Sequence, residues 1–212
     1  MSHEEPRIIR VISGYDATAT GHWSYCEQIV NAHAGVRSFF YAALELRLCI
    51  ERLCFEYLAL LTYRRRKLSK SELKLYKPKD ILKRVNNESP DFKKRMDFLN
   101  ALLEVNGSCE RMKCPDTSWL EKTHGKLGDY LHAYREPPTQ EELIRFGEFV
   151  KDTLVDLKSY IYPRMSIVDL RPHAQAVFDE YVAGRITLSS LTKRLEIATI
   201  PMHLINPPGR TD

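Results

Sequence analysis

The chain has 212 residues, a formal net charge of +4, 43% hydrophobic residues and 28% charged residues. This balance is typical of a folded globular protein and excludes an intrinsically disordered chain. No apolar run reaches the roughly 20 residues that a membrane-spanning helix needs, and the first residues lack the apolar core of a signal peptide. We therefore expect a cytoplasmic protein with no membrane association.

The chain divides into three predicted parts. Residues 1–20 predict an N-terminal arm with a candidate short strand from Ile8 to Ile12. Beyond it nearly every long segment predicts helix, and none has the alternating β-branched pattern of a strand. We predict an all-α fold, with a helical bundle of four to five core helices over residues 21–162. A short C-terminal helical extension and a flexible tail follow over residues 163–212.

The segment from Gly35 to Arg66 predicts the central helix of this bundle. It has no proline and no internal glycine, and its apolar residues nearly encircle the helix axis. Charged residues nevertheless form two stripes on it, because residues four or seven apart share a helix face. Inside a bundle these charged side chains have to form ion pairs, reach solvent or take part in a functional site. They are Glu45, Arg52 and Glu56 on one side, and Arg47 and Glu51 on nearly the opposite side.

Three signals mark the starts of later helices. A serine before a proline is typical of an N-cap with proline in the first turn. A Ser or Thr three residues before a Glu fits the capping box, in which each side chain bonds the other residue's backbone N–H. The signals are Ser89 with Pro90, Ser118 with Glu121, and Thr139 with Glu142.

Positive charge is concentrated from Arg64 to Arg95, where thirteen Lys or Arg residues stand against four Asp or Glu residues. A local basic block is the expected electrostatic signature of a phosphate-bearing partner. The alternative is a solvated loop with exposed helix ends, which are commonly rich in lysine. The residues that we predict to contact nucleic acid are Arg64, Arg65, Arg66, Lys67, Lys83 and Arg84.

The stretch from Thr123 to Glu142 contains two glycines inside a predicted helix. Gly125, Gly128 and His132 are three and four residues apart, so they share one strip of that helix. Each glycine weakens a helix by roughly 1 kcal/mol relative to alanine, and close approach of another helix is the simplest compensation. His132 then lies near that contact, in the last helical turn. Its alternative role is that of a satisfied interface histidine without chemistry.

The sequence "HGKLGDYLHA" resembles the late-helix signature of HEPN-domain proteins, in which an aromatic, a leucine, a small residue and a histidine follow one another at set spacings. The long segment "ALELRLCIERLCFEYL" resembles the early HEPN helix, whose acidic residue faces the site, a place that Glu45 or Glu51 fills. The resemblance covers roughly residues 35–160. The four places of the late-helix signature are taken by His124, Leu127, Gly128 and His132.

The resemblance implies a homodimeric helical bundle of a bacterial toxin–antitoxin, phage-defence or RNA-processing system. RNA is the implied partner, and metal-independent endoribonuclease activity is the implied reaction. His132 would be the acid or base, Lys126 or Arg135 the cation, and Asp129 or Glu51 the carboxylate that orients the histidine. Active HEPN ribonucleases carry an Arg four to six residues before the His, where this chain has only Lys126. The alternative is therefore a non-catalytic dimerising module that binds a cognate protein partner.

Pro163 and Pro172 bracket a boundary, after which the chain predicts two short helices broken at Gly184. These helices loosely resemble a helix-turn-helix, which would place Lys193 and Arg194 against DNA phosphates. A DNA-binding regulator is thus a further alternative. The structural alternative is a helical hairpin that packs on the bundle.

Five cysteines form an odd set, which favours reduced thiols. Cys109 and Cys114, with His124 downstream, lack the close spacing and the fourth ligand of a structural zinc site. Carboxylate metal sites in helical bundles use two Glu-x-x-His motifs, whereas this chain has one, from Glu121 to His124. We therefore predict neither a metal site nor a cofactor. The five are Cys26, Cys49, Cys54, Cys109 and Cys114.

Overall fold

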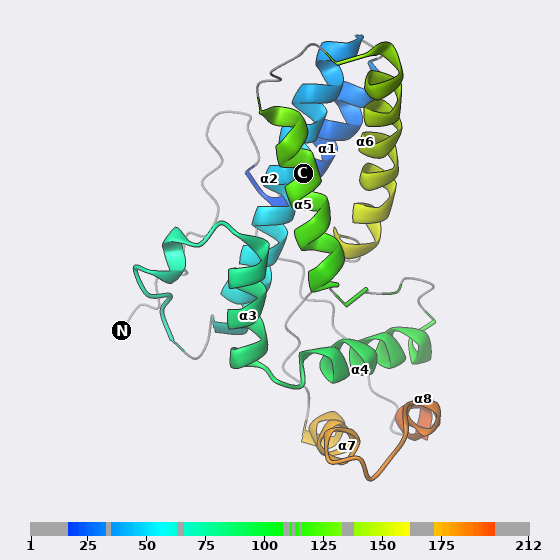
Figure 1. Ribbon diagram of the computed structural model, residues 1–212. Helices are drawn as coiled ribbons and strands as arrows, with labels where there is room; N and C mark the ends of the chain where they lie inside the picture. The colour runs from blue at the N-terminus through cyan, green and yellow to red at the C-terminus, as the bar shows by residue number, and fades with distance from the viewer. Residues whose placement is uncertain are drawn as a thin grey trace, which may run out of the picture. The chain divides into compact units, whose positions relative to one another are not determined.

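The computed structural model describes residues 17–32, 35–62, 66–107, 111, 113–114, 116–132, 138–161 and 172–197. Within these ranges the chain forms eight α-helices and a short 3-10 helix, without a strand, which confirms the predicted all-α fold (Figure 1). No described helix is long and apolar enough to cross a membrane. The candidate strand and the C-terminal tail lie outside the described residues. The elements are α1 (Ala19–Asn31), α2 (Val36–Thr62), η1 (Glu72–Lys74), α3 (Pro78–Glu88), α4 (Phe92–Val105), α5 (Thr117–Leu131), α6 (Gln140–Ile161), α7 (Pro172–Val182) and α8 (Leu188–Ile197).

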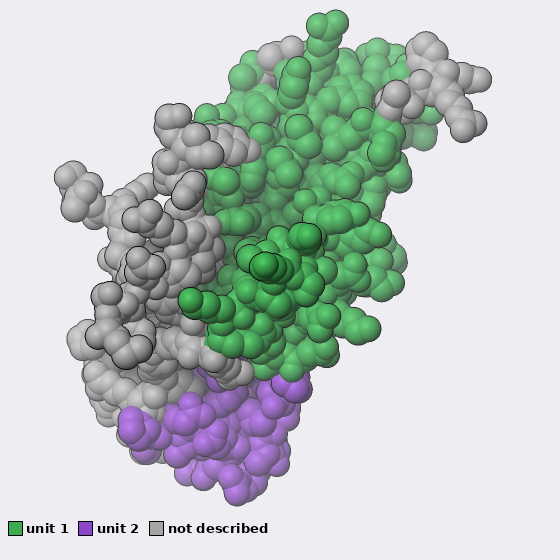
Figure 2. Space-filling view, turned by 90° about the vertical axis from the view of Figure 1, so that its left-hand side faces the viewer, with its two compact units in different colours: residues 1–89, 115–161 green, residues 90–114, 162–212 purple. Residues whose placement is uncertain are grey.

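The chain folds into two compact units, each built from two separate segments. Unit 1 comprises residues 1–89 and 115–161, and unit 2 comprises residues 90–114 and 162–212 (Figure 2). The sequence had predicted a boundary near residue 162 with α4 in the bundle, whereas α4 belongs to unit 2. An amphipathic helix reveals that it buries one face, but it does not reveal which neighbour covers that face.

α2 is the central helix of unit 1, as its sequence predicts. It packs against α1, α3, α5 and α6 (Figure 1). Buried residues recur along α2 from Ala42 to Thr62, and Leu46, Ile50 and Leu58 are completely enclosed, whereas Tyr41 and Leu44 near its start are exposed. A helix with so wide an apolar surface needs several neighbours to cover it, which explains its contacts with four helices.

The helix ends confirm one of the three predicted signals. Thr139 and Glu142 form the capping box, with Glu142 N–H donating to Thr139 Oγ1 over 3.2 Å and Thr139 N–H donating to Glu142 Oε2 over 2.7 Å. The prediction for Ser118 is wrong, because the N-cap of α5 lies two residues earlier, at Asp116, whose carboxylate accepts from Trp119 N–H over 3.0 Å. The prediction for Ser89 is also wrong, since it is the C-cap of α3.

Unit 2 is a helical hairpin, α7 and α8, packed against α4. Gly184 in the turn has a φ of +72°, a left-handed conformation that glycine adopts without strain, so the predicted break is confirmed. Phe98 of α4 meets Phe178 of α7 edge-on with ring centroids 5.2 Å apart. Leu191 and Leu195 of α8 complete this core, while Lys193 and Arg194 are exposed.

The core of unit 2 gives a direct test of the α4 assignment. Phe98→Ala removes a fully buried ring, so we expect it to lower the free energy of unfolding by about 3–5 kcal/mol. Urea titration followed by circular dichroism measures this loss. The control Leu188→Ala alters an exposed side chain and should stay within about 0.5 kcal/mol of wild type. Equal effects of the two changes would contradict the packing described.

Candidate functional site

The two charged stripes of α2 are paired inside unit 1. Glu45 Oε2 lies 2.7 Å from Nδ1 of His22 on α1. On the other side, Glu51 Oε1 lies 2.7 Å from Nε2 of His124 on α5. Glu56 accepts a hydrogen bond of 3.0 Å from the N–H of Ala19. The carboxylates of the central helix therefore tie α1 and α5 to it.

Arg47, Glu51 and His124 form a group that we name the α2–α5 cluster. Arg47 Nε donates over 3.3 Å to the same Glu51 oxygen that His124 approaches. Burial opposes the ionisation of Glu51, but the hydrogen bonds from His124 and Arg47 outweigh it and hold the pKa of Glu51 below its usual range. Glu51 is therefore a carboxylate at neutral pH. It accepts one hydrogen bond from an N–H group of Arg47 and one from an N–H group of His124.

The remaining polar atoms of the cluster are not engaged by the described residues. Within those residues, neither Nδ1 of His124 nor the two Nη groups of Arg47 has a hydrogen-bond partner. The three side chains are between 11% and 27% exposed, so the cluster lies at the edge of the α2–α5 contact. The cluster can present Nδ1 of His124 to a ligand as a base, and the planar guanidinium of Arg47 as a cation with two adjacent donor groups.

The two glycines of α5 differ in their surroundings. A Cβ on Gly128 would lie 2.4 Å from Nη1 of Arg47, so the glycine leaves room for the guanidinium against α5. A Cβ on Gly125 would meet no atom within 4 Å. Close approach therefore accounts for Gly128, although by a side chain of the neighbouring helix, and it does not account for Gly125.

His132 lies outside the helix that was predicted to hold it. α5 ends at Leu131, and His132 follows as an exposed C-cap residue with extended backbone, φ −77° and ψ 147°. Glu51 contacts His124 in its place. The Gly–His strip expected from the sequence thus breaks before His132, because the helix stops one residue too early.

The other predicted catalytic residues are dispersed. Lys126 Nζ lies 4.0 Å from the centroid of the Phe149 ring on α6, on a different side of α5 from His124. Asp129 is exposed, and no hydrogen bond joins it to His132 among the described residues. Arg135 lies outside them. Among those of the predicted residues that the structure describes, Glu51 contacts a histidine, His124.

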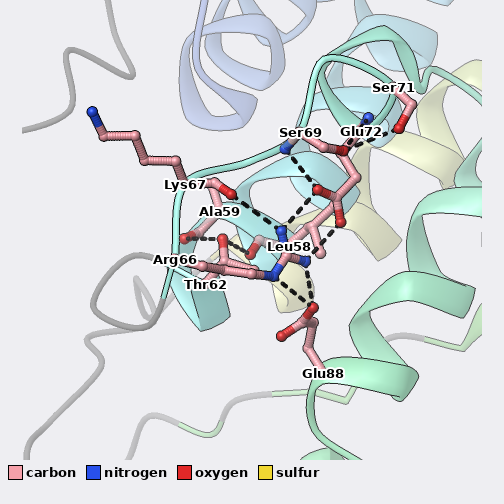
Figure 3. Close-up of polar contacts among 9 residues, drawn as sticks. All are labelled: Leu58, Ala59, Thr62, Arg66, Lys67, Ser69, Ser71, Glu72 and Glu88. Carbon is pink, nitrogen blue, oxygen red and sulfur yellow. Dashed lines mark hydrogen bonds and ion pairs between the residues drawn. The ribbon is translucent and has the colours of Figure 1, made fainter.

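Arg66, which was predicted to contact nucleic acid, is instead occupied by carboxylates (Figure 3). Its guanidinium donates to both oxygens of Glu72, over 2.8 and 2.7 Å, and its Nε donates to Glu88 over 3.1 Å. Ser69 N–H also donates to Glu72 over 2.8 Å. The hydrogen bonds from Arg66 and Ser69 lower the pKa of Glu72 to about 2. This network fastens the segment after α2 to η1 and to the end of α3.

The network changes the electrostatics of the surrounding segment. Arg66 binds both carboxylates but balances one of their two negative charges, so the network keeps a net charge of −1. Asp80 is the one exposed carboxylate between residues 67 and 84. Seven exposed cations stand against it, and we name them the basic segment. They are Lys67, Lys70, Lys74, Lys77, Lys79, Lys83 and Arg84. Arg64 and Arg65 lie outside the described residues.

The thiols of unit 1 are not poised for chemistry. Cys26, Cys49 and Cys54 are buried, and burial raises the pKa of each, that of Cys26 to about 12. Such thiols are protonated and unreactive at neutral pH. Cys109 lies outside the described residues. Over the part of the chain that the structure describes, no three His, Cys, Asp or Glu side chains are arranged to hold a metal ion.

Comparison with protein-family models, with curated proteins and with solved structures gives no match. The resemblance to HEPN domains therefore depends on the sequence motifs alone. Reasoning from those motifs missed Arg47 and His124. A usable signal was present, since Arg47 and Glu51 are four apart and so are His124 and Gly128. Where two helices pack side by side, residues four apart on one helix can face residues four apart on the other, because each pair is separated by about one turn.

The Arg66–Glu72–Glu88 network predicts a dependence of stability on pH. Because folding lowers the pKa of Glu72 from 4.5 to about 2, its ionised form stabilises the fold above pH 4.5, and this stabilisation is lost as the pH falls toward 2. We expect Glu72→Gln to lower the urea midpoint at pH 7, and the difference from wild type to shrink between pH 4.5 and 2. The control Asp80→Asn removes an exposed carboxylate and should change little. A difference that is constant with pH would contradict this role.

Proposed function

We propose that this protein binds RNA through the basic segment of unit 1. The observation that carries the proposal is the set of seven exposed cations with a single exposed carboxylate among them. Lysine and arginine side chains that neutralise phosphates release the counterions condensed on the nucleic acid, and this release drives binding. The network of Arg66 with Glu72 and Glu88 keeps a net charge of −1, and Glu121 lies 3.5 Å from Lys79, so these acids offset only part of the positive charge of the segment.

An exposed aromatic residue favours single-stranded RNA over a duplex. Tyr76 is 55% exposed, and Lys77 Nζ lies 6.0 Å from the centroid of its ring. Unpaired bases stack on such rings, whereas paired bases are hidden inside a helix. Lysines on both sides, Lys74 and Lys77, provide the backbone contacts beside the stacked base.

Charge reversal tests the basic segment. Lys83→Glu combined with Arg84→Glu should weaken binding to a single-stranded RNA at least tenfold at moderate salt. It should also reduce the steepness of the salt dependence, which is about 0.7 per phosphate contact for a single strand. Fluorescence anisotropy across a salt series measures both. The matched control Lys151→Glu with Lys158→Glu changes the same charge on α6.

The possible results distinguish a localised RNA interface from a general effect of charge and from a lack of RNA binding. Equal weakening by the α3 pair and the α6 pair would indicate a general charge effect and contradict a localised interface. Wild-type protein that binds no RNA at low salt would contradict the proposal altogether.

A second candidate function is RNA cleavage at the α2–α5 cluster. The observation that favours it is the hydrogen bond between Glu51 and Nε2 of His124, which leaves Nδ1 as the free base. Nδ1 would take the proton of a ribose 2′-hydroxyl as the 2′-oxygen attacks the adjacent phosphorus. The bond from phosphorus to the 5′-oxygen breaks, and that oxygen takes a proton from the imidazolium. Arg47 would stabilise the charge of the phosphorane.

This candidate moves the acid–base role from His132 to His124. We expect His124→Asn to reduce cleavage at least about 100-fold, and Arg47→Lys to reduce it as well, because lysine lacks the two-pronged contact. His132→Ala should cleave as wild type does. End-labelled RNA resolved on a gel measures the rate and detects the cyclic phosphate end.

The reverse pattern, with His132 essential and His124 dispensable, would return the chemistry to the residue that the HEPN motif implies. Wild-type protein that binds RNA without cleaving it favours the non-catalytic module. A cognate protein partner would then be sought by co-purification.

A further inference from the structure

Glu72 is a buried carboxylate that lies in η1, between the exposed lysines Lys70 and Lys74 of the basic segment. Its residue is 6% exposed. A negative charge at this place lowers the net positive charge of a surface that attracts phosphates. Whatever Glu72 contributes to RNA binding therefore has to come from its contacts and not from its charge.

The hydrogen bonds of Glu72 close the turn that leads into η1 (Figure 3). The N–H of Ser69 donates to Oε2 of Glu72 over 2.8 Å, and the N–H of Glu72 donates to Oγ of Ser69 over 3.2 Å. These two bonds have the reciprocal pattern of a capping box. Both oxygens of Glu72 also accept from Arg66, over 2.8 and 2.7 Å, so the carboxylate joins this turn to the end of the preceding helix.

Arg66 connects the turn to both flanking helices. Its N–H donates over 3.0 Å to the carbonyl oxygen of Thr62, the last residue of α2. Its Nε donates over 3.1 Å to Glu88, the last residue of α3, and its Nη1 donates over 3.2 Å to the carbonyl oxygen of Lys67. The chain between α2 and α3 is thus held at its start, at η1 and against the end of α3.

Glu72 is the one buried residue of the loop from Lys67 to Lys77, all of which the structure describes. The loop has no regular element besides η1. An exposed loop with so little regular structure has few contacts that order it, so the contacts of this carboxylate have a large share in fixing its shape. The exposed ring of Tyr76 lies on this loop, together with four of the seven cations of the basic segment, which are Lys67, Lys70, Lys74 and Lys77.

We propose that Glu72 is a positioning residue of the RNA interface, which holds the loop from Lys67 to Lys77 in the conformation that binds RNA. The inference rests on the proposed RNA binding. A loop that is ordered before it meets its ligand loses less conformational entropy on binding than a loop that becomes ordered in the complex. Glu72 acts through the loop and does not touch the RNA, because its carboxylate is enclosed and bound by Arg66 and Ser69.

The charge of Glu72 and its positioning role predict opposite effects of its removal. Hydrogen bonds from Arg66 and Ser69 lower the pKa of Glu72 to about 2, so the residue is ionised at neutral pH. Glu72→Gln removes this negative charge, and by charge alone RNA binding would become tighter. A loop without its anchor instead binds more weakly and contacts fewer phosphates at once, so the salt dependence becomes less steep. Lower stability alone reduces the folded fraction without changing the number of phosphates that each folded molecule contacts.

Three variants test the role on a labelled single-stranded RNA of mixed sequence, with fluorescence anisotropy across a salt series. Glu72→Gln should weaken binding at least about threefold at moderate salt. It should also lower the salt slope by about 0.7 or more, the value of one phosphate contact on a single strand. Glu72→Asp keeps the charge, but its shorter side chain cannot keep the contacts with both Arg66 and Ser69, so binding should weaken as well. The matched control Asp80→Asn removes one exposed carboxylate and should bind at least as tightly as wild type, with an unchanged slope. Circular dichroism verifies that each variant is folded.

The results separate the positioning role from RNA binding itself. If wild-type protein binds no RNA at low salt, the proposed function and the positioning role fall together. If Lys83→Glu with Arg84→Glu weakens binding while Glu72→Gln binds as tightly as wild type or more tightly, RNA binding stands and the positioning role is overturned. Weaker binding by Glu72→Gln with an unchanged salt slope would assign the effect to stability and overturn the role as well. If Glu72→Gln does not fold, the affinity and salt slope of Glu72→Asp decide in the same way.

Discussion

The structure of unit 1 depends on one constraint, the burial of most of α2 against its neighbours. A helix with a wide apolar surface gains stability only when several neighbours cover that surface. α1, α3, α5 and α6 provide this cover, and residues such as Leu46, Ile50 and Leu58 are fully enclosed. The charged residues in its middle, Glu45, Arg47, Glu51, Arg52 and Glu56, are partly buried beside these neighbours, where an unpaired charge would be unfavourable.

That constraint explains the positions of the histidines. Glu45 and Glu51 face opposite neighbours, and each lies 2.7 Å from a histidine, His22 on α1 and His124 on α5. A carboxylate at a helix contact orients the imidazole and fixes which nitrogen is free. The hydrogen bond between Glu51 and His124 stabilises the contact of α2 with α5, and it leaves Nδ1 of His124 without a partner among the described residues. One pair of residues therefore serves both the helix packing and the candidate acid–base chemistry.

Features set by neighbouring residues could be predicted from the sequence, whereas contacts between residues far apart in the chain could not. The central place of α2 follows from its composition, and the Thr139–Glu142 box is complete within four residues. The cap of α5 was misplaced because Asp116 and Ser118 are both good cap residues, two positions apart. α4 was assigned to the wrong neighbours, since its amphipathic pattern is equally compatible with either unit. The pair of Glu51 and His124 joins residues 73 positions apart, and no local pattern connects them.

The order of synthesis gives the discontinuous unit 2 a further consequence. α4 leaves the ribosome long before α7 and α8, the helices that cover Phe98 and Leu102. At about 5–20 residues per second, its apolar face is exposed for several seconds on the nascent chain. During that interval α4 is the natural target for a chaperone. A chain that terminates after α6 keeps this surface permanently uncovered, which makes such fragments prone to aggregate.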